Sequence, residues 1–163
     1  MELILDTDRL NRWLTLGANF GVFLGVILLI FELNLNRDMI RAQTRSEVSV
    51  QIAHHLELIG SDPQLASVKR RGDAGEELSA DEEQQYFLLF VANKRYWENV
   101  HYQYRQGMFD EQEFDAERTA WRRLINNNKS FARFWCPTRR TFSPDFVIEL
   151  ESLLDNNVCE STS

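Results

Sequence analysis

The sequence predicts an all-α protein in which one N-terminal transmembrane helix continues into a long stalk helix and is followed by a small helical bundle. Three observations predict this fold. The segment of residues 13–31 is apolar and uncharged, and no proline or glycine interrupts the chain between Gly25 and Gly60. The remaining apolar residues recur at helical spacing, without the alternation typical of strands. A hydrophobic content of 44% with 12% aromatic residues is enough for a core outside the membrane.

The chain is expected to divide into five parts. They are an N-terminal flank (1–12), a transmembrane helix (13–31), a stalk helix continuing the span (32–59), a helical bundle domain (60–154) and a polar tail (155–163).

The segment from Trp13 to Phe31 has the length of a membrane span. At a rise of about 1.5 Å per residue, it matches the hydrocarbon thickness of roughly 30 Å. The residues before it lack the positive region and the cleavage site of a secretory signal peptide. We therefore expect this segment to remain as an anchor in contact with membrane lipid.

Arginines flank the span unequally. Arg9 and Arg12 precede it, whereas Arg37, Arg41 and Arg45 follow it. The positive-inside rule then favours an N-terminus outside the membrane and a C-terminal domain in the cytoplasm.

Gly17, Gly21 and Gly25 form two overlapping GxxxG steps on one face of the span. Small residues in this register let a second helix approach closely, which is how helices associate in lipid. The alternative is that glycine is simply common in membrane helices. We favour a packing face, and the simplest partner is another copy of the chain.

Arg12, Thr15 and Asn19 lie on nearly the opposite face of the same helix. An amide inside hydrocarbon needs a partner, either a neighbouring helix, a water-filled lumen or its own backbone. Alternatively, Asn19 lies shallow enough to be hydrated from the interface. Two contact faces on one helix suit a homo-oligomer of three or more copies better than a dimer.

The bundle is bounded by clear start and stop signals. Gly60 followed by Pro63 ends the stalk, and Ser79 with Glu82 forms a capping box. The expected helices are a short one through Leu65 and Val68, a long one from Ser79 to about Gln106, one from Asp110 to about Ile125, one or two turns within 129–135, and a last one from Ser143 to about Leu154.

Two stretches around the span carry a resemblance. Gly17-Ala18-Asn19-Phe20-Gly21 precedes Gly25, and Phe31-Glu32-Leu33 is followed by Asn36 and by Arg41-Ala42-Gln43. This pattern resembles a group of uncharacterised bacterial single-span membrane proteins with an A-N-x-G transmembrane core and an E-[IL]-x-Q-N exit motif. Leu35 stands where that pattern usually has Gln. The resemblance implies a protein of the bacterial inner (cytoplasmic) membrane and no assigned activity.

Aromatic residues are dense between residues 86 and 104, where Tyr86, Phe90, Trp97, His101 and Tyr104 fall along one side of the predicted helix. We interpret this stripe as core packing. A ligand pocket is the alternative, and it would also need convergent polar groups.

Glu98 and His101 spell E-x-x-H, the spacing that places two metal ligands side by side on a helix. A di-metal site needs a second such pair, and His54 with Glu57 offers only the reverse order. We therefore expect no metal and no cofactor, and interpret Glu98 and His101 as a hydrogen-bonded pair at the bundle surface.

Cys136 and Cys159 are the only cysteines. They are too few and too oddly placed for a disulfide framework or a tetrahedral metal site, and they fit a reducing compartment. Cys136 is expected to be a small buried hydrophobe. The chain has neither G-x-S-x-G nor a glycine-rich phosphate loop, which favours a protein that is not an enzyme.

A net charge of −7 argues against a nucleic-acid partner. The leading prediction is a membrane-anchored, self-assembling scaffold or interaction protein, with an unidentified protein partner possible. The alternative is an oligomeric channel whose lumen is lined by the Asn19 face. A metal-dependent enzyme using Glu98 and His101 comes last.

Overall fold

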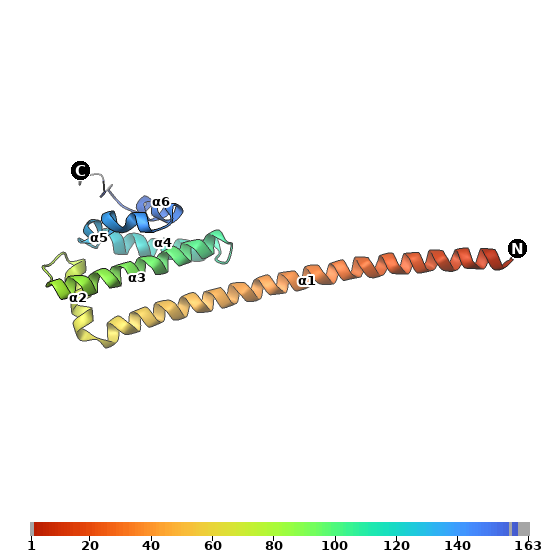
Figure 1. Ribbon diagram of the computed structural model, residues 1–163, viewed down its shortest axis with the longest axis horizontal. Coiled ribbons are helices and arrows are strands. Elements are labelled where there is room, and N and C mark those ends of the chain that lie inside the picture. The colour runs from red at the N-terminus through yellow and green to blue at the C-terminus, as the bar shows by residue number, and fades with distance from the viewer. Residues whose placement is uncertain (1, 157, 160–163) are drawn as a thin grey trace. The chain divides into compact units, whose positions relative to one another are not determined.

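The computed structural model describes residues 2–156 and 158–159, with the backbone alone for residues 2–6 and 8. Every regular element in these ranges is helical, and they contain no strand (Figure 1). The predicted all-α fold, a long N-terminal helix followed by a small helical bundle, is therefore confirmed. The elements are α1 (Glu2–Ser61), α2 (Pro63–Asp73), α3 (Ala80–Arg105), α4 (Glu111–Asn126), α5 (Phe131–Thr138), the 3-10 helix η1 (Arg139–Thr141) and α6 (Pro144–Ser152).

The chain forms two compact units, one ending at Ala42 and the other beginning at Gln43. The first unit is the N-terminal part of α1. The second, called here the helical domain, contains the C-terminal part of α1 and all later elements.

The first unit carries an apolar segment whose large side chains are exposed. Trp13, Phe20 and Phe31 are each more than 60% exposed. Within the described residues, α1 is the one helix long and apolar enough to cross a membrane. It begins at Glu2, so the helix includes residues 2–12. This unit is compatible with a single-pass membrane protein.

The predicted start and stop signals agree with the helix ends. α1 ends at Ser61, and the Asp62 carboxylate accepts hydrogen bonds from backbone N–H groups in the first turn of α2. Ser79 and Glu82 form the reciprocal capping box of α3. Asp110 caps α4 by accepting a hydrogen bond from the Glu113 N–H at 2.7 Å. These side chains satisfy N–H groups that have no partner within their own helix.

Aromatic packing dominates the core of the helical domain. The Trp97 ring of α3 stacks on the Trp121 ring of α4 with centroids 5.3 Å apart, and Trp135 of α5 is completely buried. Burial of rings of this size supplies much of the hydrophobic stabilisation of a small domain. The interpretation of the aromatic stripe as core holds for its buried members Tyr86, Phe90, Trp97 and His101, and Tyr104 stacks on Phe114 with centroids 4.0 Å apart.

One glycine is required by close packing between α2 and α3. A Cβ atom added to Gly72 would lie 2.3 Å from the ring of Tyr86. Gly72 therefore lets the Tyr86 ring lie against the backbone of α2.

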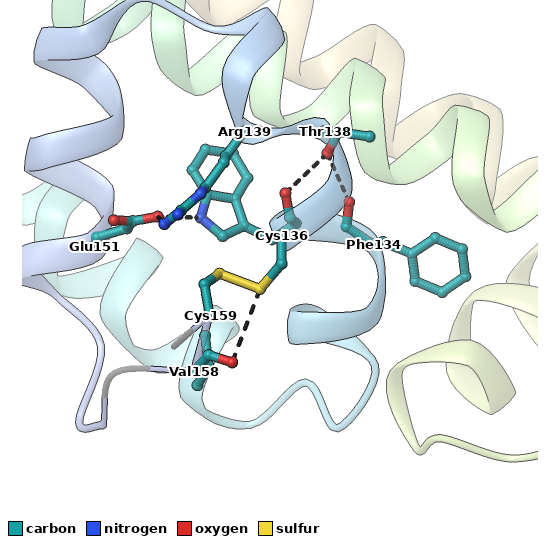
Figure 2. Close-up of a disulfide and its surroundings, with 8 residues drawn as sticks. Phe134, Cys136, Thr138, Arg139, Glu151, Val158 and Cys159 are labelled. Carbon is teal, nitrogen blue, oxygen red and sulfur yellow. Dashed lines mark hydrogen bonds and ion pairs between the residues drawn. A yellow bond between two sulfur atoms is a disulfide. The ribbon is translucent and has the colours of Figure 1, made fainter. Parts of the chain in front are cut away.

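A disulfide joins Cys136, near the end of α5, to Cys159 (Figure 2). Their Cα atoms are 5.4 Å apart, and Val158 packs against the core. The Asp155 N–H also donates to Asn126 Oδ1 at 3.0 Å. The expectation that Cys136 is a small buried hydrophobe is therefore wrong, because this residue is only partly buried and is bonded to Cys159. The spacing of two cysteines does not reveal that α6 folds back and returns the chain to α5.

Candidate functional site

The glycine face of α1 is open in the single chain. A Cβ atom added to Gly17, Gly21 or Gly25 would meet nothing within 4 Å. The backbone at these positions is thus accessible to a partner helix, as close packing in lipid requires.

The polar face of the same helix divides into two kinds of residue. The Thr15 hydroxyl donates to the Asn11 carbonyl at 2.8 Å, so it is satisfied within its own helix. Arg12 and Asn19 are exposed on the helix surface. Of the three residues predicted to form a polar contact, Thr15 therefore has no need of an external partner.

Glu98 acts as a structural acceptor between helices. Its carboxylate accepts from the Ser143 N–H at 2.6 Å and from Arg95 Nη1 at 2.7 Å. Burial opposes ionisation of Glu98, but these hydrogen bonds outweigh it and hold the pKa below its ordinary value. Glu98 therefore caps α6, whereas the side chain of Ser143 itself makes no capping bond.

His101 lies between aromatic rings. It is 6% exposed, and its ring centroid lies 5.9 Å from that of Phe114 and 6.0 Å from that of Phe146. Burial lowers its pKa. In the described chain no hydrogen bond joins His101 to Glu98, so the predicted surface pair is not formed. The described residues also contain no cluster of three or more His, Cys, Asp or Glu that could hold a metal ion.

The helical domain contains a cavity of about 410 Å³ bounded by the C-terminal part of α1, by α3 and by α4. Its wall is mainly apolar, with Ile52 and Leu56 from α1, Phe90 and Trp97 from α3, and Trp121 from α4. The volume lies within the range of about 300–1,000 Å³ typical of small-molecule sites.

Lys94 is the unusual residue of this wall. It is 4% exposed, and its Nζ atom lies 3.7 Å from the ring centroid of Trp97 and 4.7 Å from that of Phe90. Its one hydrogen bond in the described structure goes to Asn93 Oδ1 at 3.1 Å. Burial, reinforced by the positive charge of Lys69, lowers the pKa of Lys94 to about 7.

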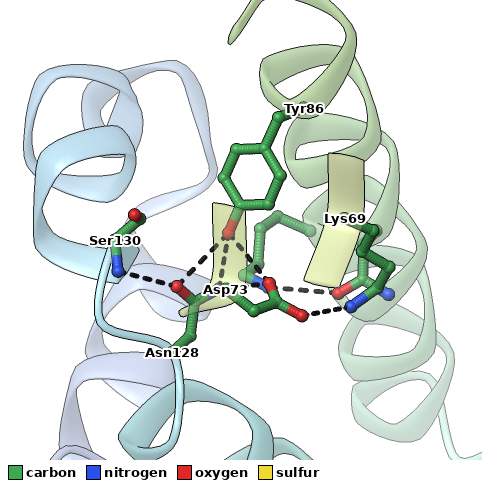
Figure 3. A network of polar contacts seen from close by, with 7 residues as sticks. Lys69, Asp73, Tyr86, Asn128 and Ser130 are labelled. Carbon is green, nitrogen blue, oxygen red and sulfur yellow. Dashed lines mark hydrogen bonds and ion pairs between the residues drawn. The ribbon is translucent and has the colours of Figure 1, made fainter. Parts of the chain in front are cut away.

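A polar network centred on Asp73 contributes another part of the wall (Figure 3). The Tyr86 hydroxyl and the Asn128 amide donate to Asp73 Oδ1 at 2.9 Å and 3.0 Å. Lys69 Nζ pairs with Asp73 Oδ2 at 2.5 Å. Burial, together with the negative charge of Asp73, raises the pKa of Tyr86 far above its ordinary value. The network thus neutralises the Asp73 carboxylate and keeps the phenol protonated.

The remaining titratable groups of the wall come from α1, α3 and α4. Burial lowers the pKa of His55 and raises that of Glu117. Glu117 Oε2 accepts a hydrogen bond from the Trp121 indole at 3.2 Å. Burial raises the pKa of Tyr96 to about 12.

The cavity combines residues that sequence reasoning found with others that it missed. Phe90 and Trp97 belong to the predicted aromatic stripe, whereas Lys94, Asp73 and Glu117 were not singled out. A signal existed for Lys94, because it lies four residues after Phe90 and three before Trp97 and so shares their face of the helix. No comparable signal marks Asp73 or Glu117, because their role depends on how α2 and α4 pack.

The described elements define an all-helical protein with one candidate membrane-spanning helix and a small helical domain. Comparison with known proteins gives no matching family, no matching curated protein and no matching solved structure.

Proposed function

We propose that this protein is a membrane-anchored, self-assembling helical interaction protein. The observation that carries the proposal is the open glycine face on a helix whose apolar window is entirely unburied. A helix in lipid gains little from hydrophobicity when it meets another helix, so close backbone contact along small residues is its main route to association. The assembled span would then hold several helical domains together for a protein partner.

Asn19 supports an assembly of three or more copies. Its amide is exposed on the side of α1 away from the glycines. In hydrocarbon this amide gains from a hydrogen bond to a neighbouring helix. A helix that makes contacts through two separate faces builds a closed ring more readily than a dimer.

The channel alternative receives less support. Its lumen would be lined by Arg12, Thr15 and Asn19, but Thr15 already bonds to its own helix. No described feature favours conduction over assembly, so we propose assembly alone.

The disulfide helps to decide on which side of the membrane the helical domain lies. Disulfides persist in oxidising compartments and are rare in the cytosol. The opposite orientation rests on three arginines against two, a small difference. We therefore favour a helical domain outside the cytoplasm, the reverse of the orientation expected from the arginines. The sequence resemblance supports placing the anchor in a bacterial inner membrane.

Native mass spectrometry of the chain in lipid nanodiscs tests the assembly. We expect a defined oligomer of three or more copies for the wild type and smaller species for Gly21→Leu, whose side chain would separate the helices. Phe20→Leu, which lies between the glycine face and the Asn19 face, is the matched control and should leave the oligomer intact. A monomeric wild type would refute self-assembly, and an unchanged Gly21→Leu oligomer would refute the glycine face.

Orientation is tested separately with reporter fusions in bacterial cells. Alkaline phosphatase fused after Ser163 should be active, because it folds only where its own disulfides form, and a green fluorescent protein fused there should be dark. The converse pair of results would place the helical domain in the cytoplasm.

A further inference from the structure

We propose that the cavity of the helical domain binds a single-chain fatty carboxylate, with its head group at Lys94 and its chain along the apolar wall.

The wall of the cavity fits an acyl chain. Aliphatic side chains of Ile52 and Leu56 and aromatic side chains of Trp97 and Trp121 line a volume of about 410 Å³. Moving the CH₂ groups of an acyl chain from water into an apolar wall is favourable. A linear apolar ligand therefore gains from this wall without needing polar partners along its length.

The carboxylates of the wall already have partners. Asp73 receives hydrogen bonds from Tyr86 and Asn128 and pairs with Lys69. Glu117 accepts a hydrogen bond from the Trp121 indole. Neither carboxylate is within ion-pairing distance of Lys94, because none of the ion pairs of the described chain includes that lysine.

Lys94 is therefore the uncompensated charge of the cavity. An ammonium group has three N–H donors, and the Asn93 amide oxygen accepts one hydrogen bond from it. The faces of Trp97 and Phe90 stabilise the cation but accept no strong hydrogen bond. A buried charge without a counter-charge is costly, and an anionic head group would supply both the charge and the acceptors.

Fluorescence quenching by brominated dodecanoic acid measures this binding in the full chain in nanodiscs. Bromine quenches indoles at contact, and Trp97 and Trp121 both line the cavity. Trp13→Phe serves as the background in every sample, because Trp13 would respond to probe dissolved in the lipid. Brominated dodecanol, which has the same chain without the charge, reports the contribution of the head group.

We expect the acid to bind at least about tenfold more tightly than the alcohol, a difference that a charged hydrogen bond supplies. Lys94→Met keeps the length of the side chain and removes the charge, so acid and alcohol should then bind within about twofold of each other. Lys129→Met, which removes an exposed lysine, should behave as the background protein does. Equal binding of acid and alcohol to the background protein, or a preference for the acid that survives Lys94→Met, would overturn the proposal.

A second variant tests the location of the chain without changing any charge. Ala120 lines the cavity and is exposed at its edge, so Ala120→Phe should fill it and weaken binding of acid and alcohol alike. Thr119→Phe adds the same ring next to the cavity without lining it and should leave binding unchanged. Undiminished binding to Ala120→Phe would place the ligand elsewhere and overturn the proposal.

Discussion

The buried ammonium of Lys94 should make the stability of the helical domain depend on pH in an uncommon direction. Burial lowers the pKa of Lys94 from its ordinary value of 10.5 to about 7. Between these two values the unfolded chain binds a proton at Lys94 that the folded chain does not, so stability rises with pH. Below pH 7 both states are protonated and the folded state carries the full cost of the buried charge.

The size of this effect follows from one proton. A difference of one proton changes the free energy of unfolding by about 1.4 kcal/mol per pH unit. Between pH 8 and 9.5 the wild type should therefore gain roughly 2 kcal/mol. The measurement stops at pH 9.5 because the pKa values of Tyr86 and Tyr96 are raised in the folded state. Tyrosines of the unfolded chain ionise near pH 10, and above that pH they make the free energy of unfolding fall as the pH rises.

Lys94→Met should remove this dependence and stabilise the domain. At pH 8 folded Lys94 is mainly neutral, and giving up the proton that the unfolded chain holds costs about 3 kcal/mol. Lys94→Met avoids this cost, so the variant should be more stable by up to about 3 kcal/mol at pH 8.

Urea unfolding of the full chain in nanodiscs, followed by near-ultraviolet circular dichroism, measures both quantities at pH 8 and 9.5. Lys129→Met is the control, since this exposed lysine should leave the slope of the wild type unchanged. A wild-type stability that is flat across this range, or a slope that persists in Lys94→Met, would refute the claim that Lys94 is buried with a depressed pKa.

Three further predictions concern packing, the disulfide and the span. Gly72→Ala should lower the free energy of unfolding in urea by about 1–3 kcal/mol, because the added methyl group would overlap the Tyr86 ring. Gly60→Ala, with open space around the added methyl group, is the control, and equal effects of the two substitutions would contradict this packing. Cys159→Ser should lower the free energy of unfolding by about 2–4 kcal/mol, and reductant should no longer change that free energy. If reductant leaves the unfolding free energy of the wild type unchanged, the disulfide is not stabilising. Liposomes containing the wild type should show no ion flux above empty ones, and a flux that Asn19→Leu abolishes would favour the channel instead.

Local signals in the sequence predicted the helix ends well. The Ser79–Glu82 capping box, the Asp110 cap and the break before Pro63 each depend on residues within three or four positions of one another. Such interactions form in the same way whatever the rest of the chain does, so their patterns can be read directly.

The features that the sequence did not predict depend on contacts between residues far apart in the chain. The disulfide depends on α6 bringing residue 159 back to α5, and the cap of α6 comes from Glu98, which is 45 positions away from Ser143. The cavity likewise needs α1, α3 and α4 to meet without filling the space between them. These features arise from tertiary geometry, which neither spacing nor composition encodes locally.

The disulfide also changes what one proteolytic cut can do to this protein. The segment between Cys136 and Cys159 contains α6, whose Phe146 and Leu150 are completely buried. A break of the chain at one point inside this segment leaves both fragments covalently joined, and a break outside α6 leaves that helix uncut. Nicked molecules would therefore run as one band on a gel without reductant and as two bands with it.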